Sequence, residues 1–126
     1  MTLENTARAL LIDDEAFVRS MLTDVLQTFG YTVDAEDSGE SALARFAPGV
    51  YDIVITDQRM PGMTGLEVAS AIRRLDPAVP VILLTGGGAV PGGEEHSEQL
   101  HMVYKPVSVV KLMAQVDDAR SHAASR

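Results

Sequence analysis

Apolar positions along the chain alternate between two spacings. Short apolar runs of strand length occupy residues 9–12, 31–35, 53–56, 79–85 and 101–104. Between these runs, and after the last one, apolar residues recur with the period of a helix that buries one face. These predicted helices occupy residues 17–29, 38–46, 66–75 and 109–116. Strands that alternate with helices indicate a parallel sheet covered on both faces, which is a doubly wound α/β fold.

One expected helix is weak. Between the last two predicted strands, residues 86–93 hold five glycines and a proline. Each glycine inside a helix costs about 1 kcal/mol relative to alanine, and proline costs about 3 kcal/mol. Residues 94–100 have room for about two turns, and isolated helices of that length are marginal in water. We therefore predict a mobile loop at 86–93 and a fourth helix that is short, displaced and weakly packed.

The composition fits a single globular domain. The chain has 126 residues, of which 46% are hydrophobic, so it is long enough to bury a core. Its net charge of −8 argues against direct nucleic-acid binding, which requires a basic face. The sequence has no cysteine, and no apolar stretch approaches the ~20 residues of a membrane span. The N-terminal residues lack the features of a signal peptide, so a cytoplasmic domain is expected.

Histidine and methionine give little indication of chemistry. The three histidines have no metal-ligand spacing and are expected at the surface or at sheet edges. The methionines at helical core spacing are expected to fill gaps in the core. Met60, Met63 and Met102 fall outside this spacing.

Polar residues close four of the predicted strands. Asp13 and Asp14 follow the first run, Asp57 follows the third, Thr85 ends the fourth and Lys105 follows the fifth. The strands of a parallel sheet point the same way, so their carboxyl ends form one edge, where ligands bind in such folds. A single aspartate at this edge would be an ordinary polar strand end. Five polar residues that converge there indicate a functional site.

The types of these residues suit phosphoryl transfer. Adjacent carboxylates raise one another's pKa unless a cation compensates, and Mg²⁺ takes oxygen ligands and bridges to phosphate. With the ion bound, Asp57 stays an anionic nucleophile that can attack phosphorus. Lys105 offers a positive charge and Thr85 a hydroxyl to the phosphoryl oxygens. The backbone N–H of Gly86 can add a third contact.

The set Asp13-Asp14, Asp57, Thr85 and Lys105-Pro106 resembles the receiver domain of two-component response regulators. The positions match in order, together with the segment MPGMTG at residues 60–65. The likeness extends over about residues 9–119 and implies a five-stranded sheet in the order 2-1-3-4-5. Residues 1–126 would then form one receiver domain with a core of about 7–122.

The resemblance also implies a role for each site residue. Asp57 would accept the phosphoryl group from phosphohistidine. Mg²⁺ would be bound directly by Asp14, by Asp57 and by the backbone carbonyl of Arg59, with Asp13 acting mainly through water. Lys105 would face the acceptor, and a cis peptide bond is expected after it, at Pro106.

The partner implied by the resemblance is a sensor histidine kinase or a histidine phosphotransfer protein. Phosphorylation would switch the interaction with a further partner. Such a domain is expected not to be an enzyme toward other substrates. Its only reactions would be the phosphorylation of its own Asp57 and the hydrolysis of that aspartyl phosphate. The motifs are similar to those of receivers attached to hybrid sensor kinases. The chain is therefore expected to be either a single-domain regulator or a receiver from a longer protein.

The chain departs from the family at one position. Receivers usually have an aromatic residue three positions before the site lysine, and it follows the threonine as that residue moves toward the phosphate. Here Met102 occupies this position, and Tyr104 directly precedes Lys105. We expect this mode of switching to be absent or altered.

Three alternative functions are open. A phosphatase of the haloacid-dehalogenase type also uses an aspartate nucleophile, but it has a second aspartate two residues later, where this chain has Arg59. A flavodoxin-like cofactor binder needs a Ser/Thr/Gly-rich phosphate loop after the first strand, where this chain has Asp13-Asp14-Glu15. A receiver that serves only as a docking module is disfavoured, because every residue of the acceptor site is present.

Overall fold

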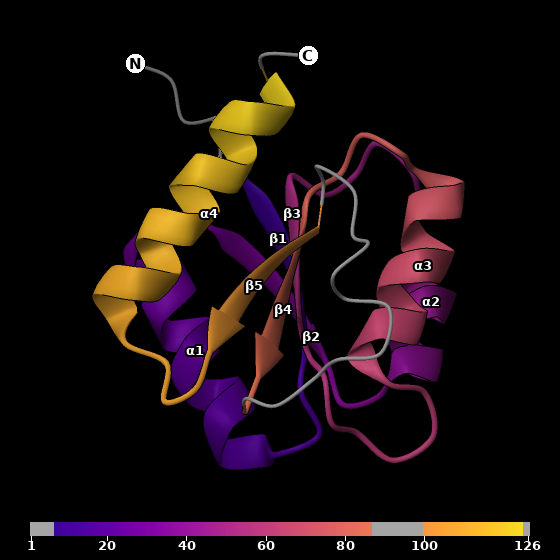
Figure 1. Cartoon of the computed structure of the whole chain (residues 1–126), viewed down its shortest axis with the longest axis horizontal. Helices are drawn as coiled ribbons and strands as arrows, with labels where there is room; N and C mark the ends of the chain where they lie inside the picture. The colour runs from indigo at the N-terminus through magenta and orange to yellow at the C-terminus, as the bar shows by residue number, and fades with distance from the viewer. Residues whose placement is uncertain (1–6, 87–99, 125–126) are drawn as a thin grey trace.

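The computed structural model describes residues 7–86 and 100–124. In these residues, five parallel strands form one sheet in the order β2-β1-β3-β4-β5 (Figure 1). The strands are β1 (Arg8–Ile12), β2 (Thr32–Glu36), β3 (Ile53–Asp57), β4 (Val81–Thr85) and β5 (Leu100–Tyr104). The helices are α1 (Ala16–Thr28), α2 (Gly39–Arg45), α3 (Gly65–Leu75) and α4 (Val109–Ala124). The predicted α/β fold and its strand order are confirmed.

Alternate residues of the strands supply two cores, one on each face of the sheet. Leu10 and Ile12 of β1 pack into the core closed by α2 and α3, whereas Leu11 packs into the core closed by α1 and α4 (Figure 1). Successive side chains of a strand point to opposite faces, so a sheet covered on both sides requires strands that are apolar throughout. The central strands β3 and β4 are accordingly buried at every residue.

The helix ends follow local signals in the sequence. Ser38 caps α2 as predicted, because its hydroxyl accepts a hydrogen bond from the N–H of Ser41 at 3.1 Å. Thr64 and Glu67 form a capping box at α3, in which each side chain accepts from the backbone N–H of the other residue. After α1, Gly30 adopts a φ of +96°, which favours glycine, and the chain turns there toward β2.

Two methionines differ from the expectation. Met21 falls at helical core spacing in α1, yet 43% of it is exposed, and Phe17 one turn earlier is 79% exposed. Met60 lies outside the helices and is buried in the core that α2 and α3 close. The apolar stripe of α1 is wider than the surface that the sheet offers, so only Leu22 and Leu26 are fully buried. Val18 and Val25 are half-buried against the same core, whereas Phe17 and Met21 are left at the surface.

Some expectations fall outside the described residues. The predicted loop at 86–93 and the short fourth helix after it belong to this group, apart from Gly86 and Leu100. His101 lies on the edge strand β5, as predicted, and its Nδ1 is 3.0 Å from the side-chain amide of Gln115. Within the described ranges, none of the helices is long and apolar enough to span a membrane.

Candidate functional site

Backbone hydrogen bonds fix the predicted site residues at one edge of the sheet. The N–H of Asp13 donates to a carbonyl of β2 at 3.1 Å, and that of Lys105 donates to a carbonyl of β4 at 2.8 Å. The N–H of Gln58, directly after Asp57, donates to another β4 carbonyl at 2.9 Å. These bonds extend the ladders of the sheet by one step. The side chains of the site are therefore carried by the rigid end of the sheet.

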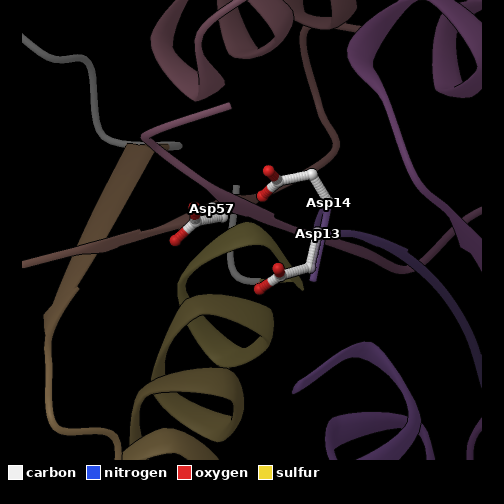
Figure 2. Close-up of side chains that lie close together, drawn as sticks. All are labelled: Asp13, Asp14 and Asp57. Carbon is white, nitrogen blue, oxygen red and sulfur yellow. The ribbon is translucent and has the colours of Figure 1, made fainter. Parts of the chain in front are cut away.

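Three carboxyl groups meet at this edge. Asp13 and Asp57 are buried, with exposed fractions of 1% and 4%, whereas Asp14 is exposed. One ligand oxygen of each lies within 4.8 Å of those of the other two. Figure 2 shows the three side chains at the ends of β1 and β3, close together. Like charges at this separation destabilise one another unless a cation lies among them.

Asp13 has one carboxylate oxygen with a partner and one without. Its Oδ1 accepts a hydrogen bond from the N–H of Glu15 at 2.9 Å. Its Oδ2 is buried and has no hydrogen-bond partner within the described part of the chain. Burial raises the pKa of the Asp13 carboxyl, and the charge of Asp57 adds to the rise, although the bond from Glu15 opposes it. A buried anionic oxygen without a donor is suited to bind a cation.

Lys105 places a positive charge against the central carboxylate. Its Nζ lies 2.5 Å from Oδ1 of Asp57. Burial lowers the pKa of Lys105, but the hydrogen bond and the charge of Asp57 outweigh this effect, so the pKa is raised overall. The lysine is therefore protonated at neutral pH. The peptide bond between Lys105 and Pro106 is cis, as predicted, and Thr85 is buried at the end of β4.

The connection between β3 and α3 contains contacts that the sequence did not reveal. Oε1 of Gln58 accepts a hydrogen bond from the N–H of Leu66 at 2.8 Å. A Cβ atom placed on Gly65 would lie 2.3 Å from the backbone oxygen of Asp57, so only glycine fits there. On the other side of the site, the guanidinium of Arg19 donates to the backbone oxygen of Asp13 at 2.8 Å. The sequence does place a glycine at the start of a helix, where a residue without a side chain cannot cap the helix. That position was the available signal for a close contact at Gly65.

The donor atoms at this edge suit Mg²⁺. Asp13, Asp14 and Asp57 all offer carboxylate oxygens, which are the hard ligands that this ion takes. The buried Oδ2 of Asp13 lacks a protein donor in the described residues, so a cation would satisfy it. Arg59, whose backbone carbonyl is expected to join them, is exposed and lies two positions after Asp57. The residues present therefore fit the predicted ion.

Comparison with known proteins identifies the family. The family model described as "Response regulator receiver domain" matches residues 9–117. The chain belongs to this family. Receiver domains are phosphoacceptors in two-component signalling that bind Mg²⁺ at an acidic cluster and take phosphoryl groups from histidine kinases. This agrees with the expectation drawn from the motifs and gives no support to the phosphatase alternative.

Curated relatives of this receiver are response regulators. It is 43% identical over 81 residues to the C4-dicarboxylate transport transcriptional regulatory protein DctD of Rhizobium meliloti, covering 64% of this chain and 18% of that protein. It is 32% identical over 120 residues to the transcriptional regulatory protein GlrR of Escherichia coli, covering 94% of this chain and 27% of that protein. The chain thus spans about a quarter or less of these relatives.

Solved structures confirm the likeness in three dimensions. The response regulator TrrA of Thermotoga maritima, in complex with Mg²⁺ and BeF, is 36% identical to this receiver with a TM-score of 0.77. The match covers 90% of this chain and 98% of that one. A receiver protein from Sinorhizobium medicae is 26% identical with a TM-score of 0.83, and the match covers 95% of this chain and 98% of that one.

Proposed function

We propose that Asp57 is the phosphoacceptor of this receiver and that Lys105 and Thr85 assist it. The observation that carries the proposal is the pairing of buried Asp57 with Lys105 Nζ at 2.5 Å, beside two further carboxylates. A nucleophile needs a fixed position and an environment that balances the charge of the incoming group. The end of β3 supplies the position, and Lys105 supplies part of the balancing charge.

The reaction is a transfer between nitrogen and oxygen. A carboxylate oxygen of Asp57 attacks the phosphorus of a phosphohistidine, an O–P bond forms, the P–N bond breaks, and the imidazole leaves with the electron pair. Transfer of this kind depends on position and on stabilisation of the equatorial oxygens. Lys105 turns from the carboxylate to one of these oxygens, and the hydroxyl of Thr85 donates to another. Thr85 ends β4, which pairs with the strand of Asp57, and Lys105 follows β5, the next strand of the sheet.

We assign the Mg²⁺ site to Asp13, Asp14, Asp57 and the backbone carbonyl of Arg59, with Asp13 acting mainly through water. When bound, the ion supplies positive charge that offsets both the carboxylates and the phosphoryl oxygens. The proximity of the three carboxylates and the unpartnered Oδ2 of Asp13 support this assignment. Asp14, the neighbour of Asp13 in the sequence, is the exposed member of the cluster.

The domain is not an enzyme toward other substrates in this proposal. Its own aspartyl phosphate is removed by hydrolysis, in which water attacks phosphorus and the Asp57 carboxylate leaves. Every chemical step therefore begins or ends on the same side chain. The lifetime of the phosphorylated state would depend on how water reaches this edge of the sheet.

The phosphoryl donor is a histidine of a sensor kinase or a phosphotransfer protein. Apolar side chains that such a partner could cover flank the site: Phe17 is 79% exposed and Met21 43% exposed on α1, and Val110 is 79% exposed in the first turn of α4. Between α1 and the segment that precedes α4, a groove is lined by Met21 and Pro106 and reaches Lys105. Exposed apolar groups in such a patch are typical of a protein contact.

The boundaries of the domain and its parent protein stay predictions. We expect residues 1–126 to form one receiver domain with a core of about 7–122, of which the family match covers 9–117. The relatives named above are regulators of transcription, and a hybrid kinase parent is an open prediction. The altered switch at Met102 also stays a prediction. Met102 is half-buried against the core, and Tyr104 is 57% exposed.

Phosphorylation of defined variants tests the proposal. With Mg²⁺ and phosphoramidate, whose P–N bond resembles that of phosphohistidine, the wild-type protein should gain one acid-labile phosphoryl group by intact mass. Asp57→Asn should not be labelled, because an amide is a poor nucleophile and lacks the charge that the metal requires. Labelling of Asp57→Asn at the wild-type rate would contradict the proposal.

Asp52→Asn is a matched control. Asp52 lies just before β3, is exposed, and accepts a hydrogen bond from the N–H of Arg8 at 2.8 Å, a bond that the amide oxygen of asparagine can also accept. This variant should be labelled as the wild type is. Loss of labelling in both variants would show that the substitution acts on folding and not on the acceptor.

A further inference from the structure

Gln58 lies between two residues of the proposed metal site, Asp57 and Arg59. Three hydrogen bonds hold it in place. Its N–H donates to the carbonyl of Leu84 on β4 at 2.9 Å, and its carbonyl accepts from the N–H of Gly65 at 3.0 Å. Its side-chain Oε1 accepts from the N–H of Leu66 at 2.8 Å. The first two bonds use backbone groups that nearly every residue has. The third bond requires the glutamine side chain.

The bond to Leu66 ties the start of α3 to the end of β3. Leu66 is the second residue of α3, so its N–H has no partner inside the helix. The capping box satisfies the N–H of Glu67, and Gln58 satisfies that of Leu66. Residues 59–64 therefore form a turn whose two ends are joined by two hydrogen bonds, one from Gly65 and one from Leu66.

We propose that Gln58 is a positioning residue for the phosphoacceptor and its metal. This inference rests on the function proposed above. There, Asp57 and Arg59, the residues on either side of Gln58, both contribute ligand oxygens. Mg²⁺ demands near-ideal octahedral geometry, so its affinity is sensitive to small displacements of these oxygens. By fixing the backbone between the two ligands, the Gln58 side chain holds both in place.

The close approach of Gly65 supports the same arrangement. A Cβ atom on this residue would lie 2.3 Å from the backbone oxygen of Asp57, so the first residue of α3 rests directly against the acceptor. Displacement of the helix start would therefore be transmitted to Asp57. The Gln58 side chain provides the specific bond that opposes such displacement.

Coupling between the ion and this bond must be reciprocal. If the Gln58–Leu66 bond strengthens Mg²⁺ binding, then Mg²⁺ must strengthen the bond. We expect the amide of Leu66 to exchange its hydrogen more slowly in Mg²⁺ than in metal-free buffer. This readout is independent of phosphorylation and needs only the wild-type protein.

Gln58→Met removes the acceptor and keeps a similar side-chain length. Calorimetric titration with MgCl₂ should show binding about two- to tenfold weaker than in the wild type, the range expected for one neutral hydrogen bond. The Leu66 amide should exchange faster in the metal-free variant. Gln58→Glu keeps an acceptor for this N–H, so it should restore the slow exchange of Leu66.

Gln115→Met is the matched control, because it makes the same change far from the site. Gln115 loses its 3.0 Å contact with His101, so stability can fall while Mg²⁺ affinity stays at the wild-type value. Equal Mg²⁺ affinity in Gln58→Met and the wild type would overturn the inference, and so would an equal loss in Gln115→Met. If Gln58→Met does not fold, unchanged Leu66 exchange on addition of Mg²⁺ to the wild type overturns it. Failure of the wild type to bind Mg²⁺ would instead overturn the proposed function on which it rests.

Discussion

Asp34 on β2 and Asp13 at the end of β1 are acidic side chains of neighbouring strands, yet their surroundings differ. Asp34 accepts a hydrogen bond from the hydroxyl of Tyr51 at 2.7 Å. Its carboxylate oxygens also form ion pairs, Oδ2 with Nε of Arg8 at 3.8 Å and Oδ1 with Nη1 of Arg45 at 3.7 Å. Asp13 has a second carboxylate beside it and one buried oxygen without a donor in the described residues. The first acid is neutralised by the protein, and the second is not.

The partners of Asp34 form a closed network. Arg45 also pairs with Glu36, and Tyr51 stacks on the ring of Phe46 with centroids 5.8 Å apart. Burial, followed by the hydrogen bond to Asp34, raises the pKa of Tyr51 to about 12, so its hydroxyl stays a donor at neutral pH. Such a network ties α2 to β2 and to the start of β3. Its charges have no need of an added ion.

The cluster at the carboxyl edge has the opposite balance. Three carboxylates share this edge with Lys105, which is engaged by Asp57. An acidic cluster that lacks matching cations costs stability in the empty protein and gains it when a cation binds. The comparison therefore separates acids that support the fold from acids that prepare a site.

Neutralising each acid should change stability in opposite directions. In metal-free buffer, Asp13→Asn should raise the free energy of unfolding by about 1 kcal/mol, because it removes a poorly solvated charge and keeps the Oδ1 acceptor for Glu15. Asp34→Asn should lower it by about 0.5 kcal/mol, the usual value for partly exposed ion pairs. Urea unfolding of both variants measures the difference. Equal signs would contradict the comparison.

Tyr51→Phe should affect only the neutralised network. It removes the hydroxyl that donates to Asp34 at 2.7 Å and leaves the stacked ring in place. The expected loss is about 1 kcal/mol of unfolding free energy, the contribution of one hydrogen bond. The response of the melting temperature to Mg²⁺ should be unchanged. A variant with weaker Mg²⁺ stabilisation would show that the two clusters are coupled.

The pH dependence of Asp13 gives a smaller effect with a defined sign. Its pKa is raised in the folded protein above the ordinary value of 3.8, so folding favours its protonated form. This stabilisation is present below pH 3.8 and is lost as the pH rises through the folded pKa. In metal-free buffer the stability advantage of Asp13→Asn over the wild type should therefore increase as the pH rises above 3.8. An advantage that shrinks over this range would contradict the raised pKa.

Much of the site could be predicted because strand ends are visible in the sequence. Asp57, Thr85 and Lys105 each follow an apolar run, and a parallel sheet brings the ends of such runs to one edge. The ladder bonds that extend the strands then fix the side chains without further signals. This part of the site follows from topology alone.

The remaining features depend on contacts that no local pattern encodes. The Gln58 side chain accepts a hydrogen bond from the N–H of Leu66 because the start of α3 lies beside the end of β3. A pattern of apolar and polar positions along the sequence does not show this proximity. The periodicity of α1 did predict a helix but not which apolar residues are covered, so Phe17 and Met21 were not foreseen at the surface. Burial depends on the width of the opposing surface as well as on the helical period.

Thermal unfolding of the wild type with and without Mg²⁺ tests the central claim, that the carboxylates of Asp13, Asp14 and Asp57 form a cation-binding site. We predict a higher melting temperature in millimolar MgCl₂ than in NaCl of equal ionic strength, by roughly 3–6 °C for each kcal/mol of binding linkage. Asp13→Asn should lose most of this increase, and Asp34→Asn should keep it. An identical melting temperature in the two salts would contradict the claim.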